Sequence, residues 1–424
     1  MAFQPRIVNL DGLRVVLVKD DRQSVMVQSL IDAGSREETE KQAGSAHFLE
    51  HFVFKGTKKY PGVFDISGKV ESVGGKYNAW TSHSDTGFWV KTAKEKLDLG
   101  LSLVGQMMSE PNLPQEYFDK ERGTILQEYY MYEDQPQAKA WRAMWEKMLG
   151  RTNMGRQVIG TLKSLKEMKL DYLKEFMNTW YGAENMLVGV VGAYGDEKEL
   201  LKNIRTEFAG VYLRKGKLPV RDVFRWGDQE KPKISLVKRK TDQAAVSMGI
   251  PGTELLSKYR YVRYLVNIIL GGSSISRLFL EVREKRGWAY SVGSEVESFK
   301  DFGVVGVGGG FPTDKVHDAV SLIVEIMGGL GGKSKWEITQ KDLEMAKECY
   351  TGRMSLKFDK PEQVLSMTMS SLIEEGKIYT PEHHIEQAKK VTMDQIKEYC
   401  HEIMDLKKVN IGILGDYKEV PVKL

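Results

Sequence analysis

The sequence predicts an α+β protein made of two similar domains, each a mostly antiparallel sheet packed against helices. Three observations support this prediction. The chain has 424 residues, about three times the commonest domain length, and 41% of them are hydrophobic. A faint internal repeat recurs after roughly 220 residues, a period long enough for a whole domain. Strand-like segments joined by short turns, with helices grouped together, are typical of α+β domains rather than of doubly wound nucleotide-binding folds.

The repeat is clearest in the pairs of expected strands. Alternating apolar residues predict strands at Arg14–Lys19 and Val25–Ala33, closed by Gly34, and again at Ile234–Val237 and Ala244–Ile250. Helices are expected after each pair, at Ser45–Phe54, Leu97–Met108, Pro114–Met148 and Leu162–Trp180 in the first half, and at Tyr261–Leu270, Val316–Met327, Gln340–Met354 and Pro361–Glu374 in the second. Short apolar strands, Met186–Gly192 and Val409–Gly415, are expected to end the halves.

The two halves are separated by a segment of different character. Residues 214–232 are highly charged, contain two prolines and have no clear periodicity, so we interpret them as a linker. The domains are then expected at 1–213 and 233–424.

Composition excludes several classes of partner. The 62 basic and 58 acidic residues leave a net charge of +4, which predicts no nucleic-acid partner. No apolar run reaches the roughly 18 residues that cross a bilayer, and the N-terminus enters a strand-like pattern without a signal-peptide profile. We therefore expect a cytoplasmic protein, or one whose presequence has been removed, with no membrane partner.

Two of the seven histidines lie in one short motif, His47-Phe48-Leu49-Glu50-His51. On a helix, positions i, i+3 and i+4 share a face, so His47, Glu50 and His51 project together. Two imidazoles one turn apart can chelate zinc, and the neighbouring carboxylate can accept a proton from a water molecule that the ion activates. The order H-x-x-E-H is that of the inverted zincins.

A catalytic zinc ion usually has a third protein ligand, and one helix offers it. Two carboxylates, Glu121 and Glu128, fall on an otherwise apolar stripe, where burial is costly unless each meets a cation or hydrogen-bond donors. The expected stripe is Phe118, Glu121, Ile125, Glu128 and Tyr132. The two carboxylates are two helical turns apart, so one could ligate the metal while the other orients a ligand. Their spacing does not say which does which.

Over nearly its whole length the chain resembles the family of pitrilysin, insulin-degrading enzyme and the mitochondrial processing peptidase. The resemblance is specific because HFLEH is followed by a glutamate 77 residues after His51. It rests on Gly34-Ser35-Arg36-Glu37, Ala46–Thr57 (AHFLEHFVFKGT), Tyr77-Asn78-Ala79 with Thr81, Glu121 and Glu128, Ser276–Phe279, Val282–Glu284 and Gly287–Ser291. The length is similar to the branch of half-length, dimeric subunits, which implies a processing-peptidase-like metallohydrolase fold.

The resemblance implies roles for the residues of the first half. His47, His51 and Glu128 would bind one zinc ion per subunit, Glu50 would be the general base, and Glu121 would support a ligand. The first domain would then be catalytic. Displacing the HFLEH motif by about 218 residues, the offset between Gly34 and Gly252, leads to LVNII, so the second domain is expected to lack the metal motif.

Four further residues match substrate-binding positions of the family. Asn78 and Ala79 match a strand that pairs with the substrate backbone by β-augmentation. Arg283 and Tyr290 match an Arg/Tyr pair that holds substrate carbonyls and stabilises the oxyanion. The resemblance implies that this pair acts in trans, and because one chain carries both sets of residues, we expect a homodimer.

These inferences predict a zinc metalloendopeptidase that hydrolyses short or unfolded polypeptides in a chamber between subunits. Two alternatives remain at this stage. One is a non-catalytic scaffold with the same fold, and the other is a catalytic subunit that needs a different partner chain.

Overall fold

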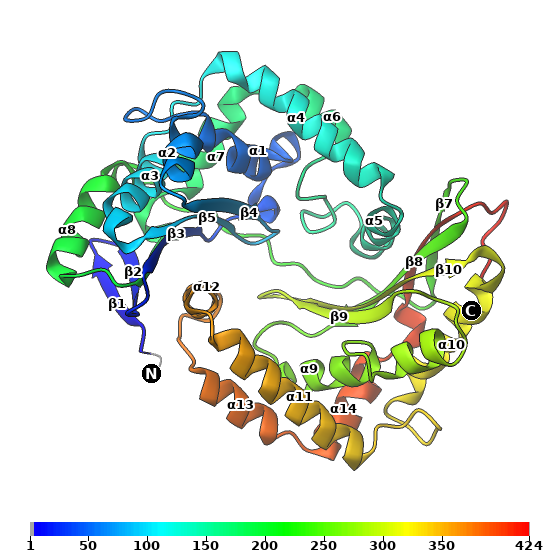
Figure 1. Ribbon diagram of the computed structural model, residues 1–424. Helices are drawn as coiled ribbons and strands as arrows, with labels where there is room; N and C mark the ends of the chain where they lie inside the picture. Colours follow the sequence, from blue (N-terminus) through cyan, green and yellow to red (C-terminus); the bar gives the residue numbers. More distant parts are fainter. Residues whose placement is uncertain (1–3, 424) are drawn as a thin grey trace. The chain divides into compact units, whose positions relative to one another are not determined.

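A computed structural model describes residues 4–423 of the chain. Two mixed sheets and the helices that cover them make up the fold (Figure 1). The predicted α+β class and the two similar sheet-and-helix domains are confirmed.

The first sheet has six strands and places β4 at its edge. Their spatial order is β1 (Arg6–Leu10), β2 (Leu13–Lys19), β6 (Met186–Gly192), β3 (Ser24–Ile31), β5 (Thr86–Ala93) and β4 (Lys76–Thr81). Neighbouring strands run antiparallel except β2 and β6, which are parallel. Within this sheet β4 pairs only with β5, where Asn78 lies opposite Trp89 and Ala79 opposite Phe88.

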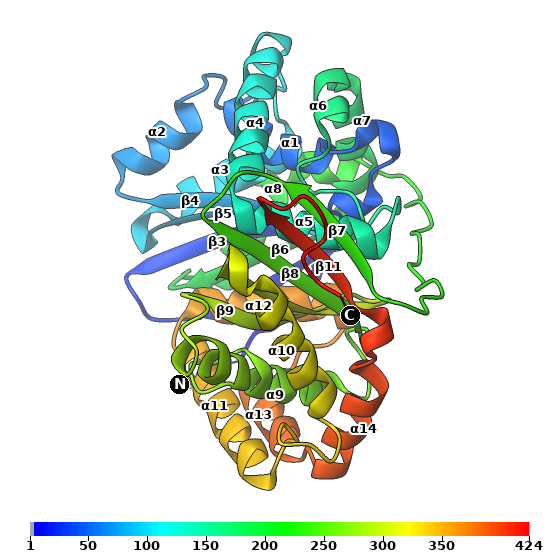
Figure 2. The same ribbon diagram turned by 90° about the vertical axis from the view of Figure 1, so that its right-hand side faces the viewer.

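The second sheet repeats this topology with five strands (Figure 2). Their order is β7 (Lys233–Lys238), β11 (Asn410–Gly415), β8 (Gln243–Gly252), β10 (Gly303–Pro312) and β9 (Val292–Ser298). The parallel pair is β7 with β11, as β2 is with β6. The order matches β2, β6, β3, β5 and β4, so the internal repeat of the sequence corresponds to a repeat of topology.

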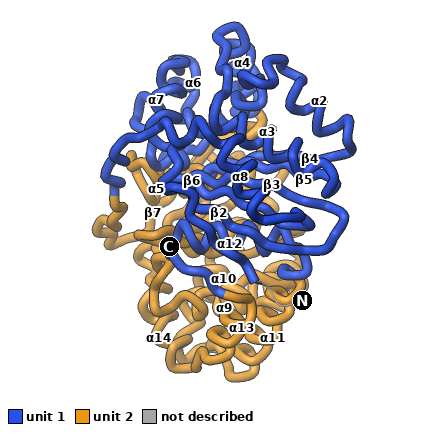
Figure 3. Tube along the Cα trace, turned by 90° about the vertical axis from the view of Figure 1, so that its left-hand side faces the viewer, with its two compact units in different colours: residues 1–129, 156–222, 357–379 blue, residues 130–155, 223–356, 380–424 orange. Residues whose placement is uncertain are grey.

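The chain forms two compact units, shown in Figure 3. Unit 1 consists of Met1–Tyr129, Arg156–Asp222 and Lys357–Tyr379, and unit 2 of Tyr130–Gly155, Val223–Leu356 and Thr380–Leu424. The change from unit 1 to unit 2 at Asp222 lies within the irregular segment 214–232. The two units are not the two halves of the sequence on either side of this segment. Unit 1 includes the helical residues Lys357–Tyr379 of the second half, and unit 2 includes Tyr130–Gly155 of the first half.

The expected helices are present, two of them divided by a break, together with further helices that were not predicted. The helices of unit 1 are α1 (Ser45–Phe52), α2 (Asp65–Ser72), α3 (Leu97–Ser109), most of α4 (Gln115–Asp134), α6 (Leu162–Glu167), α7 (Leu170–Trp180), α8 (Glu197–Glu207) and α12 (Pro361–Glu375). Those of unit 2 are α5 (Pro136–Leu149), α9 (Arg260–Leu270), α10 (Val316–Gly329), nearly all of α11 (Gln340–Phe358), α13 (Pro381–Lys389) and α14 (Met393–Ile403). The helices that were not predicted are α2, α8, α13 and α14. None of these described helices has both the length and the apolar character needed to span a bilayer.

The expected helix Pro114–Met148 is in fact two helices. Gln135 is extended, with φ −82° and ψ 112°, because the proline that follows it disfavours the helical region. The chain therefore turns between α4 and α5. The expected helix Leu162–Trp180 is also divided, at Met168 and Lys169, whose ψ values of 136° and 145° are extended.

Helix α12 covers one face of the first sheet. In Figure 1 it lies on the opposite side of this sheet from α1 and α3. Its buried residues Val364, Leu365, Met369 and Leu372 pack on the side chains of β2, β3 and β6, each contributing on the order of 1.5–3 kcal/mol. Gly189 of β6 permits this approach, since a Cβ atom there would lie 2.5 Å from Met369 Sδ.

Helix α5 covers the second sheet in the same way. It packs on β7, β8 and β11, and a Cβ atom at Gly412 of β11 would lie 2.1 Å from the carbonyl oxygen of Ala140. Gly189 and Gly412 occupy equivalent positions in the two repeats. The central strands of both sheets thus have a glycine where a helix from the opposite half of the sequence crosses them.

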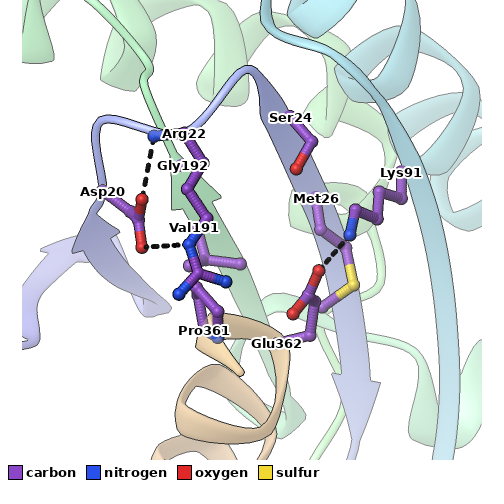
Figure 4. Close-up of a pocket in the computed structure, with 9 residues that line it drawn as sticks. All are labelled: Asp20, Arg22, Ser24, Met26, Lys91, Val191, Gly192, Pro361 and Glu362. Atoms are coloured by element: carbon purple, nitrogen blue, oxygen red, sulfur yellow. Dashed lines mark hydrogen bonds and ion pairs between the residues drawn. The ribbon is translucent and has the colours of Figure 1, made fainter. Parts of the chain in front are cut away.

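Polar contacts fasten the first turn of α12 to the sheet (Figure 4). Lys91 of β5 forms an ion pair with Glu362, and Arg22 donates to the carbonyl oxygen of Asp359 at 2.9 Å. Asp20 in turn holds Arg22, with 3.5 Å between Oδ2 and Nε. These side chains surround the small pocket drawn in Figure 4, which lies at the start of α12.

Candidate metal centre

The helix that carries the H-x-x-E-H motif begins at a strained position. Gly44, the N-cap of α1, has φ +95°, and a Cβ atom there would lie 2.7 Å from the carbonyl oxygen of Ile159. Only glycine tolerates both conditions easily. The start of α1 is therefore fixed against the segment that precedes α6.

Aromatic packing joins α1 to α4. The ring of Phe118 on α4 stacks on Phe48 at a centroid distance of 4.9 Å and lies 6.0 Å from Phe52. All three side chains are at most 1% exposed. The motif face of α1 consequently lies beside the carboxylates of α4.

The stripe on α4 is nearly the one predicted. Phe118, Glu121 and Ile125 are buried, and Glu128 is half-buried. Tyr132 was expected to continue the stripe but is 41% exposed, and Tyr129 is buried in its place. The difference arises because a helix has 3.6 residues per turn, so the buried face drifts from the positions that a strict seven-residue spacing would select.

His47, His51 and Glu128 converge in unit 1. His47 Nε2 lies 3.6 Å from Glu128 Oε1, and His51 Nε2 lies 3.3 Å from Glu128 Oε2. One ligand atom from each residue lies within 4.8 Å of the others. In a tetrahedral zinc site with bonds of about 2.0–2.1 Å, two ligand atoms are about 3.3–3.4 Å apart. The spacing of these donors therefore fits a single zinc ion.

The electrostatics of Glu128 also fit a cation. Its Oε2 atom is inaccessible to solvent and makes no hydrogen bond among the described residues. The neighbouring imidazoles of His47 and His51 hold the pKa of Glu128 well below its usual range, although burial acts in the opposite direction, and His51 Nε2 lies 3.3 Å from Oε2 without the geometry of a hydrogen bond. A buried carboxylate oxygen without a donor is costly, and a metal ion would supply its missing partner.

Glu121 supports one of the imidazoles. Its Oε1 lies 3.1 Å from His51 Nδ1, and its Oε2 accepts from Lys55 Nζ at 2.8 Å. Burial raises the pKa of Glu121, but the contacts with His51 and Lys55 outweigh it, so that the net shift is downward. A carboxylate in this place orients the ring of His51 and leaves Nε2 facing Glu128.

His51 itself has a strongly shifted pKa. Burial lowers it, but the hydrogen bond with Glu121 and the negative charges of Glu121 and Glu128 outweigh burial and raise it to about 9. In the absence of a metal, His51 therefore holds a proton at neutral pH. A metal ion must displace this proton to bind Nε2.

Glu50 is held from the edge strand of the sheet. Thr81 Oγ1, at the end of β4, donates to Glu50 Oε2 at 2.6 Å. The carboxylate lies on the same helix as both histidines and is half-buried. This contact fixes the orientation of the residue expected to act as the base.

The expected substrate strand is β4. Asn78 is exposed, Ala79 is half-buried, and the main chain of β4 pairs with a strand on one side only within its sheet. An edge strand of this kind can accept an extended peptide by β-augmentation. The same strand carries Thr81, so its end lies beside Glu50.

Arg283 and Tyr290 lie together in unit 2. Arg283 Cζ lies 5.2 Å from the centroid of the Tyr290 ring and 4.7 Å from that of Phe279. Arg283 belongs to a short π-helical segment, Phe279–Glu284, a type of turn found frequently at functional sites. The Tyr290 side chain is 83% exposed.

Two contacts of this site were not predicted from the sequence, that of Thr81 with Glu50 and that of Lys55 with Glu121. Both residues belong to the motifs that resemble the family, but neither was assigned a role. A signal for Lys55 was present, because it follows His51 by four residues and so continues the same helical face. The position of Thr81 depends on sheet register, which the sequence alone does not specify.

Two family models match consecutive parts of the chain. Residues 14–162 match the insulinase family, peptidase family M16, and residues 167–349 match the M16 inactive domain. The chain belongs to peptidase family M16. The first match contains the whole cluster of His47, Glu50, His51 and Glu128, whereas the second contains LVNII, which lies in α9 at the equivalent place.

Curated relatives are similar over almost their full length. An uncharacterized zinc protease of Mycobacterium leprae is 29% identical over 96% of this chain and 90% of its own. The uncharacterized zinc protease YmxG of Bacillus subtilis is 28% identical over 93% of this chain and 94% of its own. These matches extend across both repeats.

Solved structures share the fold. A protease from Helicobacter pylori has a TM-score of 0.88 at 21% identity, covering 97% of this chain and all of its own. The M16 inactive domain from Pseudomonas fluorescens has a TM-score of 0.86 at 19% identity, covering 99% of each chain. The two-domain arrangement of sheets and helices is therefore that of M16 proteins.

Proposed function

We propose that this chain is a zinc metalloendopeptidase. The single observation that carries the proposal is the convergence of His47, His51 and Glu128 at spacings that fit a tetrahedral ion. Family membership and relatives named zinc proteases support a metallopeptidase. A structural neighbour named as a protease adds the same indication.

The proposed division of labour follows from the contacts. A bound zinc ion would polarise the scissile carbonyl and make water a better nucleophile at neutral pH. Glu50 accepts the proton of that water at Oε1 or Oε2 and returns it to the leaving amine, while Thr81 keeps the carboxylate in place. Glu121 holds His51 so that its Nε2 remains available for the metal.

We further propose that the substrate is an extended peptide added to β4. Asn78 and Ala79 lie in β4 at the free edge of the first sheet, where the main-chain groups of alternate residues can bind an extended chain with little regard to its sequence. A peptide that pairs with Ala79 would replace the contact between its N–H and Asn78 Oδ1, which is 2.9 Å long. A segment folded as a helix could not pair with β4 in this way, because its main-chain groups are bonded within the helix. Short or unfolded polypeptides are therefore the proposed substrates.

The active assembly that we propose is a homodimer whose subunits enclose a chamber. Arg283 and Tyr290 of one subunit would contact the substrate at the metal centre of the other. A guanidinium and a phenol suit this task because both donate hydrogen bonds to a carbonyl oxygen that becomes negatively charged. The support is that each chain carries one metal motif and one Arg/Tyr pair.

The test is a combined metal and cleavage assay on the wild type, Glu50→Gln and His51→Ala. We expect about one zinc ion per chain and chelator-sensitive cleavage of a quenched peptide in the wild type. Glu50→Gln should keep the zinc and lose nearly all turnover, and His51→Ala should lose both. A wild type without metal or cleavage would favour a scaffold, and a zinc-loaded but inactive monomer would favour a need for another partner chain.

A further inference from the structure

A buried glutamate outside the metal centre holds the helix that carries it. Glu38 follows β3 and is 1% exposed. Its Oε2 accepts the N–H of Gly44 at 2.8 Å, and its Oε1 accepts the N–H of Ala46 at 2.8 Å. The two carboxyl oxygens thus accept from two amides at the start of α1, that of the N-cap Gly44 and that of Ala46 in the first turn.

This contact replaces an ordinary helix cap. The N-cap of α1 is Gly44, which has no side chain, so the free amides of the first turn have no local acceptor. Glu38, which precedes Gly44 by six residues, supplies the acceptor. The Ala46 amide precedes His47 directly, and one turn later come Glu50 and His51.

The arrangement is costly, which argues that it has a task. Burial raises the pKa of the Glu38 carboxyl to about 8, and the amides of Ala46 and Gly44 together with Arg156 act against that rise. The Arg156 guanidinium also donates to the main-chain carbonyl of Glu38, which fixes the backbone from which the carboxylate extends. An exposed serine or aspartate at the N-cap would accept from an amide of the first turn without burying a carboxyl group.

Resting on the proposed function, we propose that Glu38 is a positioning residue for the metal centre: its carboxylate fixes the start of α1 so that His47, Glu50 and His51 face Glu128. A metal site must be held within about 0.5 Å of its productive geometry. Packing of Phe48 and Phe52 on Phe118 restrains the apolar side of α1. The Glu38 contacts restrain its rotation and its shift along the axis.

The test uses Glu38→Gln with Glu37→Gln as the matched control. Glutamine keeps the size and one acceptor but turns an amide donor towards one of the two backbone N–H groups. Glu37 is a suitable control because its side chain is 2% exposed, yet it accepts from the N–H of Gly34 at 2.9 Å and not from α1. Glu38→Asp serves as a second variant that keeps a carboxyl group but is too short to reach both amides.

Three quantities are measured: the zinc dissociation constant, kcat and KM at saturating zinc, and amide hydrogen exchange of α1. We expect Glu38→Gln and Glu38→Asp to weaken zinc binding about 10- to 100-fold and to lower kcat with KM nearly unchanged. Glu37→Gln should change the zinc dissociation constant and kcat by no more than about threefold, even if it lowers the thermal midpoint as much as Glu38→Gln does. Folded Glu38 variants with wild-type zinc affinity and kcat, or an equal loss in Glu37→Gln, would overturn the role.

Hydrogen exchange separates this proposal from the proposed function. If the wild type binds no zinc and cleaves no peptide, the metallopeptidase proposal fails, but the α1 amides still report on Glu38. Exchange of these amides at least about tenfold faster in Glu38→Gln than in Glu37→Gln would support the restraint on α1. Equal exchange in the two variants would refute it.

Discussion

Thr81 Oγ1 lies 2.6 Å from Glu50 Oε2, which joins the edge strand expected to bind substrate to the residue expected to act as base. We predict that Thr81→Val lowers kcat by about 10- to 100-fold, because the carboxylate loses the donor that orients it. Valine keeps the β-branched shape, so the strand and the zinc content should be unchanged. Steady-state kinetics with metal analysis would measure both.

Thr81→Ser provides the matched control for this prediction. Serine keeps the hydroxyl and loses only a methyl group, so Thr81→Ser should retain most of the wild-type kcat. Equal activity of wild type and Thr81→Val would show that Glu50 needs no orientation by β4. A loss in Thr81→Ser as large as that in Thr81→Val would show that the hydroxyl alone does not sustain activity and that the methyl group is also required at this position.

A second prediction concerns Glu121, which contacts His51 and Lys55 at the same time. Glu121→Gln should weaken zinc binding about 10- to 100-fold, because the carboxylate that orients the imidazole is lost. Competition with a fluorescent chelator would measure it. Glu110→Gln is the control, since Glu110 forms an exposed ion pair with Lys58 at 3.1 Å and should leave zinc affinity unaltered.

The third prediction is that zinc affinity increases with pH up to about 9. His51 must be neutral to bind a metal, and its pKa in the metal-free protein is raised to about 9. Below that pH a proton has to leave, so the apparent dissociation constant should fall about tenfold for each pH unit between 6 and 8. Dissociation constants measured at several pH values would check this.

Glu121→Gln should also change the shape of this pH profile. The mutation removes a contact that raises the pKa of His51, so the affinity should stop increasing at a lower pH than in the wild type. An identical profile in both proteins would show that another group controls the proton released on binding.

Much of the metal centre is predictable because it depends on helical periodicity. The spacing of His47, Glu50 and His51 places them on one face of α1, and two turns separate Glu121 from Glu128. Spacing alone could not assign the two carboxylates, because that depends on how α4 lies against α1. Only the packing of aromatic rings between the helices specifies that arrangement.

Periodicity could not predict that α5, from the first half of the sequence, covers the second sheet, or that α12, from the second half, covers the first sheet. Both helices are recognisable from the sequence, but their apolar faces do not state which sheet they cover. Gly412 is the clearer local sign of this arrangement, since the backbone of α5 approaches it closely, whereas Gly189 is met by the side chains of Met369 and Leu365. The identity of the approaching helix requires three-dimensional information.

The fourth prediction concerns mixed dimers of two inactive variants. Glu50→Gln removes the base, and Tyr290→Phe removes the phenol, so each homodimer should have little activity. If Tyr290 acts in trans, a dimer with one chain of each kind contains one site with both functional residues. Random mixing makes half of the dimers of this kind, so activity should recover to about a quarter of the wild-type level.

The control is a mixture of Glu50→Gln with the double variant Glu50→Gln, Tyr290→Phe, which cannot form an intact site in any arrangement. Light scattering during size exclusion would establish that the chains are dimeric, and a different affinity tag on each variant, used in two successive steps, would isolate the mixed dimer. Recovery confined to the first mixture would place Glu50 and Tyr290 of one site on different chains. If the isolated mixed dimer stayed as inactive as its parents, each site would take Glu50 and Tyr290 from the same chain. In that case one site of the mixed dimer lacks the base and the other lacks the phenol.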